Sequence, residues 1–538
     1  MQTSEQCDVL VIGGGVAGCG VFRDLSTRGI KAVLVEKGDF GSGTTSRSTR
    51  IVHGGIRYLE SFEFGLVREG LRERSILLRI APHLVKPLRF VIPVYRGASP
   101  GRLKIKFGMI LYDLLSLGKT LPSHGFLSRE EAKRMVPTIS IEGLAGAYLY
   151  YDAQVPLVER LCVENVMSGE RSGGRAYNYC EAIGLLRDGE AVRGAVVRDA
   201  EDGREREVRS RYVVNCTGPW VDGFLGVSLG RKNPLLTLTK GIHLFCTRFS
   251  EEAVVFYSSD GRLLFAIPWQ GYSLVGTTDT VYSGPVEGVR SEKEDVEYLL
   301  AALGRRFPGV DPRPFSTVAG LRPLAFADSD HPSKISRGYS VVDHRQDGAD
   351  GLVSVLGVKI TEYRAAAEKV GSLISLRLGK RVASKTAILP LSEDAGDRVA
   401  AGPLPRSVEE HLLDVYGPRA GLAAEEIAKD GSLLSALCPH NPDIEAQVVV
   451  AVKFELARSA ADFLLRRSCI GYTPCRGLDA VGRVAQLMGV RLGWSNERVL
   501  LEQSEYAGFV GWRDEALPPE QKSLREDQTP PASTRGSA

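Results

Sequence analysis

An α/β fold that opens with a Rossmann-type β-α-β unit is predicted by three features of the N-terminal sequence. Residues 8–12 form a short apolar run (DVLVI) that leads directly into a glycine-rich turn at residues 13–18 (GGGVAG). Alternating small and apolar residues follow as far as Gly29, which predicts a helix and its end. A second apolar run, residues 31–36 (KAVLVE), ends in the acid Glu36. The order strand, turn, helix, strand is that of a parallel βαβ unit.

The rest of the chain predicts further domains, because 538 residues are too many for one hydrophobic core. A helical pattern covers residues 63–80, and the spacing of a capping box starts helices at Ser128, Ser291 and Ser407. Strands are expected at residues 191–197, 212–215, 241–245, 263–267 and 273–276. Since strands far apart in sequence can join one sheet, we expect the domain that contains the βαβ unit to be discontinuous.

The composition changes near residue 400, where strand signals stop. Asn441 and Pro442 suit a helix start, and we expect that helix to run to about Arg467. Two more helices are expected, at residues 478–492 and after Ser495. Residues 396–515 are therefore predicted to form a helical domain. Residues 516–538 are mostly polar and rich in Pro and charge, and are predicted to be a disordered tail.

Composition and charge exclude several classes of protein. Lys plus Arg (68) nearly balances Asp plus Glu (65), so a dedicated nucleic-acid binder is not expected. The nine cysteines form no CxxC pair, which favours reduced thiols in a cytoplasmic protein. Cys438 and His440 lie close in sequence, but two ligands do not make a zinc site, and no metal is predicted. No apolar run is long enough to span a membrane and no signal peptide is expected, so we predict a cytoplasmic location.

The glycine-rich turn predicts a dinucleotide site. Gly13 suits the tight turn, Gly15 lets the backbone approach a pyrophosphate, and Gly18 allows close helix–strand packing. Glu36 is placed to accept hydrogen bonds from a ribose, and its charge disfavours the 2′-phosphate of NADP. FAD and NAD both remain open at this point. A second small-residue turn at residues 215–220 follows a later strand, as such turns often do beside the dinucleotide of flavoproteins.

Longer motifs carry a resemblance to a known family. Residues 53–60 (HGGIRYLE) resemble the HGGxRYLE motif of FAD-dependent glycerol-3-phosphate dehydrogenases. Further matches follow in the same order at residues 218–221, 240–243, 267–269, 276–279, 320–324 and 359–364. In the helical region Glu455, Asp462, Arg466, Arg467 and residues 492–495 are also similar to that family. The resemblance covers roughly residues 6–512.

The resemblance implies a fold like that of D-amino-acid oxidase and glycine oxidase. It implies a Rossmann-type FAD-binding domain (about 6–80, 150–222 and 317–375) and a substrate domain with an antiparallel sheet (about 81–149 and 223–316). It implies oxidation of sn-glycerol 3-phosphate to dihydroxyacetone phosphate, with electrons usually passed to a membrane quinone and in some relatives to oxygen. A homodimer is a further possibility. The expected FAD contacts are Ile12, Gly13, Gly14, Gly15, Val16, Ala17, Gly18, Glu36, Lys37, Thr44, Thr45, Ser46, Ser48, Gly54, Gly55, Thr217, Gly218, Trp220, Gly357, Lys359 and Ile360.

The substrate of such an enzyme is a phosphomonoester dianion with a secondary alcohol. Fixed cations are needed to bind it, and the expected contacts are Arg57, Tyr58, Arg322, Lys359 and Thr361. Oxidation also requires removal of the hydroxyl proton, for which histidine suits neutral pH. Both His53 and His243 lie in matched motifs, and the sequence does not choose between them. Arg322 is also a catalytic candidate, because a cation stabilises a developing alkoxide.

Three positions depart from the family pattern. Val358 stands where a second glycine is common, Glu362 where threonine is common, and Ile242 where serine is common. Because of these departures, the sequence leaves open which electron acceptor the protein uses and how the substrate is oriented in detail. The alternatives are an oxidase that uses oxygen, another flavin-dependent amine or amino-acid oxidase, and a non-catalytic dinucleotide-binding sensor.

A peripheral membrane contact is suggested by residues 102–117 (RLKIKFGMILYDLLSL). At helical spacing, Leu103, Phe107, Ile110, Leu111 and Leu114 share one face, and basic residues gather at the start. An ordinary core helix of the substrate domain explains the same apolar face. The sequence leaves both interpretations open.

Overall fold

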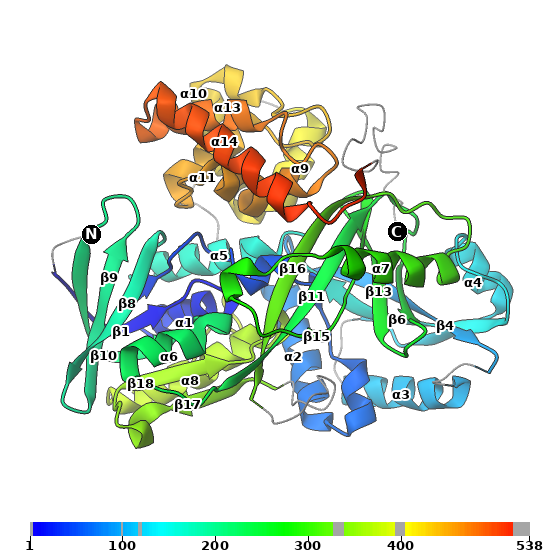
Figure 1. Ribbon diagram of the computed structural model, residues 1–538, viewed down its shortest axis with the longest axis horizontal. Coiled ribbons are helices and arrows are strands. Elements are labelled where there is room, and N and C mark those ends of the chain that lie inside the picture. The colour runs from blue at the N-terminus through cyan, green and yellow to red at the C-terminus, as the bar shows by residue number, and fades with distance from the viewer. Residues whose placement is uncertain (1–3, 98–100, 117–120, 327–337, 393–403, 520–538) are drawn as a thin grey trace.

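Two β-sheets and a helical domain make up the computed structural model, which describes residues 4–97, 101–116, 121–326, 338–392 and 404–519 (Figure 1). The first sheet has eight strands and the second has ten. The predicted α/β fold is confirmed. The expected disordered tail lies largely outside the described residues.

The first sheet carries the nucleotide turn. Its order is β17-β18-β10-β1-β2-β7, and β9 pairs with β10 and β8. The strands β7, β2, β1, β10 and β18 pair in parallel. Its members are β1 (Ser4–Ile12), β2 (Ala32–Val35), β7 (Arg175–Tyr177), β8 (Cys180–Asp188), β9 (Ala191–Asp199), β10 (Glu205–Asn215), β17 (Ser340–Asp343) and β18 (Leu352–Leu356).

The second sheet is antiparallel apart from the parallel pair β4 and β12. Its order is β15-β11-β14-β13-β12-β4-β6-β3, with β16 beside β11 and β5 beside β6. Its members are β3 (Ile51–Val52), β4 (Lys86–Tyr95), β5 (Gly125–Leu127), β6 (Leu144–Gln154), β11 (Leu236–Cys246), β12 (Ala253–Tyr257), β13 (Leu263–Trp269), β14 (Tyr272–Gly276), β15 (Thr280–Val281) and β16 (Pro314–Ala325). Residues 317–325, expected in the flavin domain, therefore lie in this sheet.

Helices cover both sheets. One face of the first sheet packs on α1 (Val16–Thr27), α5 (Val158–Arg171) and α8 (Tyr363–Arg377), and the other on α6 (Val221–Leu229). The second sheet packs on α4 (Arg129–Met135) and α7 (Lys293–Arg306). The helices α2 (Phe64–Ile80) and α3 (Arg102–Leu115) contact each other, and both contact β6 of the second sheet (Figure 1).

The helical domain lies on one side of the two sheets (Figure 1). It comprises α9 (Arg406–Tyr416), α10 (Gly421–Lys429), α11 (Glu445–Phe454), the short α12 (Ala460–Asp462), α13 (Val481–Leu492) and α14 (Asn496–Arg513). It shares a hydrophobic core with the second sheet, where the ring of Tyr472 stacks 5.2 Å from that of Phe245. It is therefore packed against the sheets rather than tethered to them.

Buried ion pairs also fix the helical domain. Arg467 and Arg466 both pair with Asp39, in the loop after β2. Glu455 accepts hydrogen bonds from Arg160 of α5 at 2.8 Å and lies 3.2 Å from Arg419. These side chains are buried except that of Arg466, which is 11% exposed, so each buried charge depends on its partner.

Some predicted elements differ in the structure. The helix expected from Asn441 to Arg467 is interrupted at residues 455–459, where Leu456 has a φ of +57°. The capping box predicted at Ser128 is confirmed. The box predicted at Ser291 lies one residue later, on Glu292 and Asp295, and α9 begins after Pro405 without the box predicted at Ser407.

The apolar face of α3 points outward. Leu103, Phe107, Ile110 and Leu114 are exposed, whereas Met109 and Tyr112 of the same helix are buried. Leu111, the fifth residue of the predicted face, is partly buried against the core. The core-helix interpretation is therefore wrong for four of the five residues. Within the part of the chain that the structure describes, no helix combines the length and the apolar character needed to cross a bilayer.

Candidate active site

A cavity of about 1450 Å³ runs between the two sheets, from the glycine-rich turn to the residues expected to bind substrate. The expected FAD contacts that line it are Ile12, Gly13, Gly15, Val16, Ala17, Glu36, Lys37, Thr44, Thr45, Ser48, Gly55, Thr217, Gly218, Trp220, Gly357, Lys359 and Ile360. All the expected substrate residues and His53 also line it. Gly14, Gly18, Ser46 and Gly54 do not, and neither does His243.

Three of the four glycines of the turn, Gly13, Gly15 and Gly18, meet different neighbours. Gly13 has a φ of +103°, and a Cβ there would lie 2.5 Å from the carbonyl oxygen of Cys216. A Cβ on Gly18 would lie 1.8 Å from the carbonyl oxygen of Gly13. A Cβ on Gly15 would meet only Thr45 Oγ1, at an ordinary 3.6 Å, and would otherwise project into the cavity. Protein packing therefore requires Gly13 and Gly18, whereas Gly15 leaves room that suits a bound pyrophosphate.

Glu36 closes the nucleotide end of the cavity. Its carboxylate accepts hydrogen bonds from the backbone N–H groups of Gly14, at 2.6 Å, and Gly38, at 2.8 Å. Burial raises the pKa of Glu36, and the two hydrogen bonds oppose that rise. The group is held on the cavity wall, where it suits an adenosine ribose.

The loop of residues 41–50 (GSGTTSRSTR), called here the hydroxyl-rich loop, follows β2 and joins the two sheets over the cavity. The N–H of Val16 donates to Thr45 Oγ1 at 3.1 Å, and Thr44 Oγ1 donates to the carbonyl oxygen of Leu321 on β16 at 2.8 Å. Thr45 thus occupies the N-terminus of α1, while Thr44 anchors the loop to the substrate sheet.

The second small-residue turn stands opposite this loop. Trp220 Nε1 donates to Glu287 Oε1 at 2.6 Å, and Lys37 Nζ lies 4.2 Å from the centroid of the Trp220 ring. Gly218 has a φ of +60°, and none of the residues that the structure describes would contact a Cβ there. The turn therefore forms cavity wall.

The three cationic side chains expected to bind substrate all line the cavity, namely Arg57, Arg322 and Lys359. The Arg322 guanidinium is held by Asp279 Oδ1 at 3.1 Å and by Thr277 Oγ1 at 2.8 Å. It packs on Gly241, where a Cβ would lie 2.2 Å from its Nη2. Arg322 is thus fixed in orientation before any ligand binds.

Lys359 is held by a carboxylate that departs from the family pattern. Its Nζ lies 3.1 Å from Glu362 Oε1 and 4.4 Å from the centroid of the Tyr58 ring. Glu362 is buried, and its Oε2 has no hydrogen-bond partner among the described residues. Burial raises the pKa of Glu362, although the charge of Lys359 opposes the rise.

The two candidate histidines occupy different positions. His53 lines the cavity, and its backbone N–H donates to Thr361 Oγ1 at 3.0 Å. His243 is buried behind the wall, where its Nε2 lies 2.9 Å from Thr49 Oγ1. Burial, together with the nearby Arg322 and Arg50, lowers the pKa of His243 to about 3. His243 is therefore neutral at physiological pH, and it contacts Thr49, which lines the cavity.

Sequence reasoning missed several cavity residues. Arg47 and Arg50 lie in the hydroxyl-rich segment but were not singled out, and both line the cavity. Arg466 and Phe509 line it from the helical domain, to which sequence analysis assigned no chemistry. The double arginine at residues 466–467 was the available signal, because adjacent arginines that are largely shielded from solvent need carboxylate partners elsewhere in the fold.

Comparison with known proteins agrees with this geometry. Residues 8–358 match the family described as FAD dependent oxidoreductase, and residues 364–499 match the C-terminal domain of alpha-glycerophosphate oxidase. A glycerol-3-phosphate dehydrogenase of Synechocystis is 37% identical over 94% of this chain and 96% of its own length. Glycerol-3-phosphate dehydrogenase 2 of Mycobacterium tuberculosis is 35% identical, over 94% and 88%.

Solved structures give the same result. The glycerol-3-phosphate dehydrogenase of Bacillus halodurans, complexed with FAD, has a TM-score of 0.76 at 26% identity, covering 95% of this chain and 96% of that one. A glycine oxidase of Geobacillus kaustophilus shares the fold, with a TM-score of 0.53 at 21% identity over 73% of this chain and all of its own length. FAD is thus the dinucleotide of this cavity, which settles the choice between FAD and NAD. The chain belongs to the FAD-dependent glycerol-3-phosphate dehydrogenase family.

Proposed function

We propose that this protein oxidises sn-glycerol 3-phosphate to dihydroxyacetone phosphate in the cavity between its two sheets. The observation that carries the proposal is one cavity lined both by the nucleotide turn and by His53 and the expected cations Arg57, Arg322 and Lys359. Bound FAD supplies the acceptor for the hydride that leaves carbon 2. The names of the relatives support the choice of substrate.

The cations suit the phosphate of this substrate. Arginine presents a planar fork that bonds two phosphate oxygens at once, and Lys359 adds a point charge. Because Asp279 and Thr277 already orient Arg322, little side-chain entropy is lost when the dianion binds. We assign phosphate binding to Arg57, Arg322 and Lys359, with the Tyr58 and Thr361 hydroxyl groups beside them.

The hydroxyl proton of the substrate goes to His53 in this proposal. His53 is the candidate that lines the cavity, and its backbone is fixed by Thr361. His243 is assigned a positioning role, because it touches the cavity wall through Thr49 and is too weak a base to hold a proton at neutral pH.

Electrons are proposed to leave the flavin for a membrane quinone. Most of the apolar face of α3 is exposed, and Leu103 and Phe107 have exposed fractions of 81% and 70%. Phe62, 77% exposed, follows Glu60, which pairs with Lys104 of α3. An apolar patch bordered by basic side chains suits an anionic membrane surface. The protein is thus proposed to lie at the cytoplasmic face of a membrane.

The test is anaerobic addition of sn-glycerol 3-phosphate to the purified flavoprotein, with the visible flavin absorption as readout. We expect rapid bleaching, followed by reoxidation on addition of a soluble quinone. Retained FAD that does not bleach would contradict the substrate assignment. Bleaching that is reversed by oxygen as fast as by quinone, with peroxide formed, would favour an oxidase instead.

A further inference from the structure

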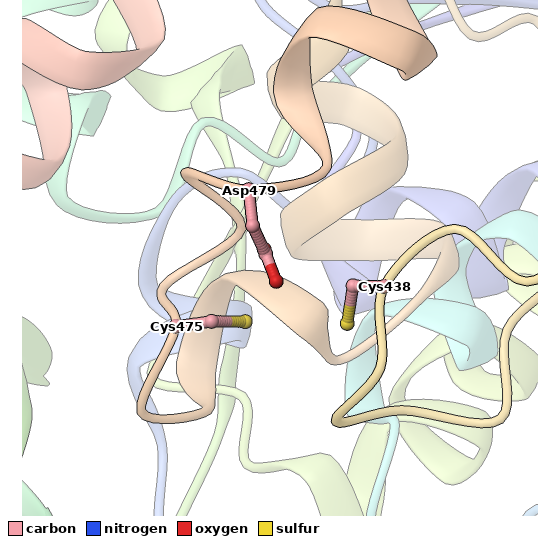
Figure 2. A group of neighbouring side chains, drawn as sticks. All are labelled: Cys438, Cys475 and Asp479. Atoms are coloured by element: carbon pink, nitrogen blue, oxygen red, sulfur yellow. The ribbon is translucent and has the colours of Figure 1, made fainter. Parts of the chain in front are cut away.

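Two loops of the helical domain bring two thiols and a carboxylate together at a point remote in sequence from the flavin motifs (Figure 2). Cys438 lies in the loop that precedes α11, and Cys475 and Asp479 lie in the loop that precedes α13. The two sulfur atoms and a carboxylate oxygen all lie within 4.8 Å of one another. None of the three side chains is among the residues that line the flavin cavity.

The sulfurs are hydrogen-bonded in the way that metal-bound sulfurs often are. Asn441 Nδ2 donates to Cys438 Sγ at 3.1 Å and lies 3.9 Å from Cys475 Sγ. Thr473 Oγ1 lies 3.3 Å from Cys475 Sγ. Such polar neighbours orient a sulfur ligand and compensate thiolate charge.

The three groups present two sulfur donors and one carboxylate oxygen donor to a common point. That donor set suits a single divalent cation. Two sulfur ligands select a soft or borderline ion such as Zn²⁺ over Mg²⁺ or Ca²⁺. Cys438 is buried, Cys475 is partly buried and Asp479 is exposed, so solvent reaches the open side of the cluster.

We propose that Cys438, Cys475 and Asp479 bind one Zn²⁺ ion, with water as the fourth ligand. The ion would join two irregular loops of the helical domain, each of which leads into a helix packed on the domain core. Sequence alone did not indicate the site, because Cys438 and His440 offered too few ligands and only the fold adds Cys475 and Asp479.

The test is zinc binding by the full flavoprotein after treatment with a strong chelator. We expect it to take up one equivalent of Zn²⁺ in competition with a chromophoric chelator. Cys438→Ser and Cys475→Ser should abolish this uptake, and Asn441→Ala should weaken it about 10- to 100-fold. Cys469→Ser is the matched control, because Cys469 is a buried thiol of the same domain outside the cluster. Replacement by Co²⁺ should give tetrahedral d–d bands at wavelengths beyond the flavin absorption.

Three outcomes would overturn the proposal. One is no zinc uptake by the wild-type protein, and another is uptake that Cys438→Ser and Asp479→Asn leave unchanged. The third is the loss of two titratable thiols on oxidation with no zinc bound, which would make the pair a disulfide. Asp479 is exposed, so Asp479→Asn keeps the test valid if a cysteine variant fails to fold.

Discussion

At the residue scale, the two histidines make different predictions. His53→Ala should lower kcat by about 10²-fold or more, because the cavity loses the base that takes the hydroxyl proton. The base must be unprotonated, so wild-type kcat/KM should rise with pH through its pKa, and the rise should be absent in His53→Ala. The measurement is the pH dependence of kcat/KM with a soluble dye as acceptor.

His243→Ala serves as the comparison. Because the pKa of His243 is about 3, its titration falls far below the assay range. We therefore expect this variant to lose activity through misplacement of Thr49 while keeping the rise of kcat/KM with pH. A rise that vanishes in His243→Ala and persists in His53→Ala would reverse the two assignments.

The carboxylate of Glu362 sets a second prediction at this scale. Its ion pair with Lys359 reduces the positive charge available to the substrate phosphate. Glu362→Gln should therefore lower KM for sn-glycerol 3-phosphate by up to about fivefold, which corresponds to an ion pair worth ~1 kcal/mol. The measurement is steady-state KM and kcat at constant ionic strength.

Glu368→Gln is the matched control, because that carboxylate pairs with Arg364 and does not line the cavity. A higher KM in Glu362→Gln would mean that Glu362 orients Lys359 more than it weakens its charge. The raised pKa of Glu362 also predicts how KM depends on pH. Below that pKa the carboxyl is neutral and frees Lys359, so KM of wild type and variant should converge as pH falls.

Residues were predictable from sequence where a local motif explains them. The turn at Gly13–Gly18 and the cations in glycine-flanked turns are of this kind. Arg466, Phe509 and the position of His243 behind Thr49 were not, since each depends on packing between segments distant in the chain. A motif places a histidine near a site but does not state which side of the wall it occupies.

At the scale of elements, the first βαβ unit and the helix of residues 63–80 follow from periodicity. The helix expected across residues 441–467 forms only in part. It is interrupted after Phe454, because Glu455 pairs with Arg160 and Arg419 and the chain turns at Leu456. Tertiary charge pairing overrides a favourable local pattern here. The helix α3 shows a different limit of sequence patterns. Its amphipathic spacing predicts which residues share a face, but it does not predict what covers that face.

The exposed face of α3 predicts membrane binding that a single charge should weaken. Phe107→Asp removes an apolar side chain whose burial is worth ~1.5–3 kcal/mol, so binding to anionic vesicles should fall by more than about tenfold. The measurement is flotation with vesicles at low salt. Activity with a soluble dye should be unchanged, because Phe107 does not line the cavity.

Val490→Asp is the matched control for α3. Val490 is 79% exposed on α13 of the helical domain, so it tests the effect of a new charge away from the patch. Equal loss of binding in both variants, or no binding by the wild-type protein at low salt, would reject α3 as the membrane contact.

At the scale of the whole molecule, the helical domain contributes to the wall of the flavin cavity and is not a separate appendage after the flavin-binding part of the chain. Arg466 and Phe509 reach the cavity, and Asp39, three residues beyond Glu36, holds Arg466 and Arg467. The nucleotide turn and the helical domain are therefore joined through one carboxylate. No local pattern shows such a junction, because its two halves lie at opposite ends of the chain.

A second buried carboxylate, Glu455, joins the helical domain to Arg160 of α5, and it should make the stability of the protein depend on pH. Arg160 and Arg419 lower the pKa of its carboxyl from 4.5 to about 2, against the effect of burial. A depressed pKa in the folded state gives stability that is present above the unfolded value and is lost as pH falls toward the folded one. We expect Glu455→Gln to destabilise the protein by about 3–5 kcal/mol at neutral pH, because two buried arginines lose their charge partner.

The measurement is the thermal midpoint of wild type and Glu455→Gln from pH 7 down to the lowest pH at which both fold. The difference between them should stay constant above about pH 5 and narrow below pH 4.5, where the unfolded wild type begins to take up the proton. Glu205→Gln is the control, because the exposed pair of Glu205 with Arg198 should shift stability by less than ~1 kcal/mol. A constant difference down to the lowest pH would show that Glu455 acts by shape and hydrogen bonding rather than by charge.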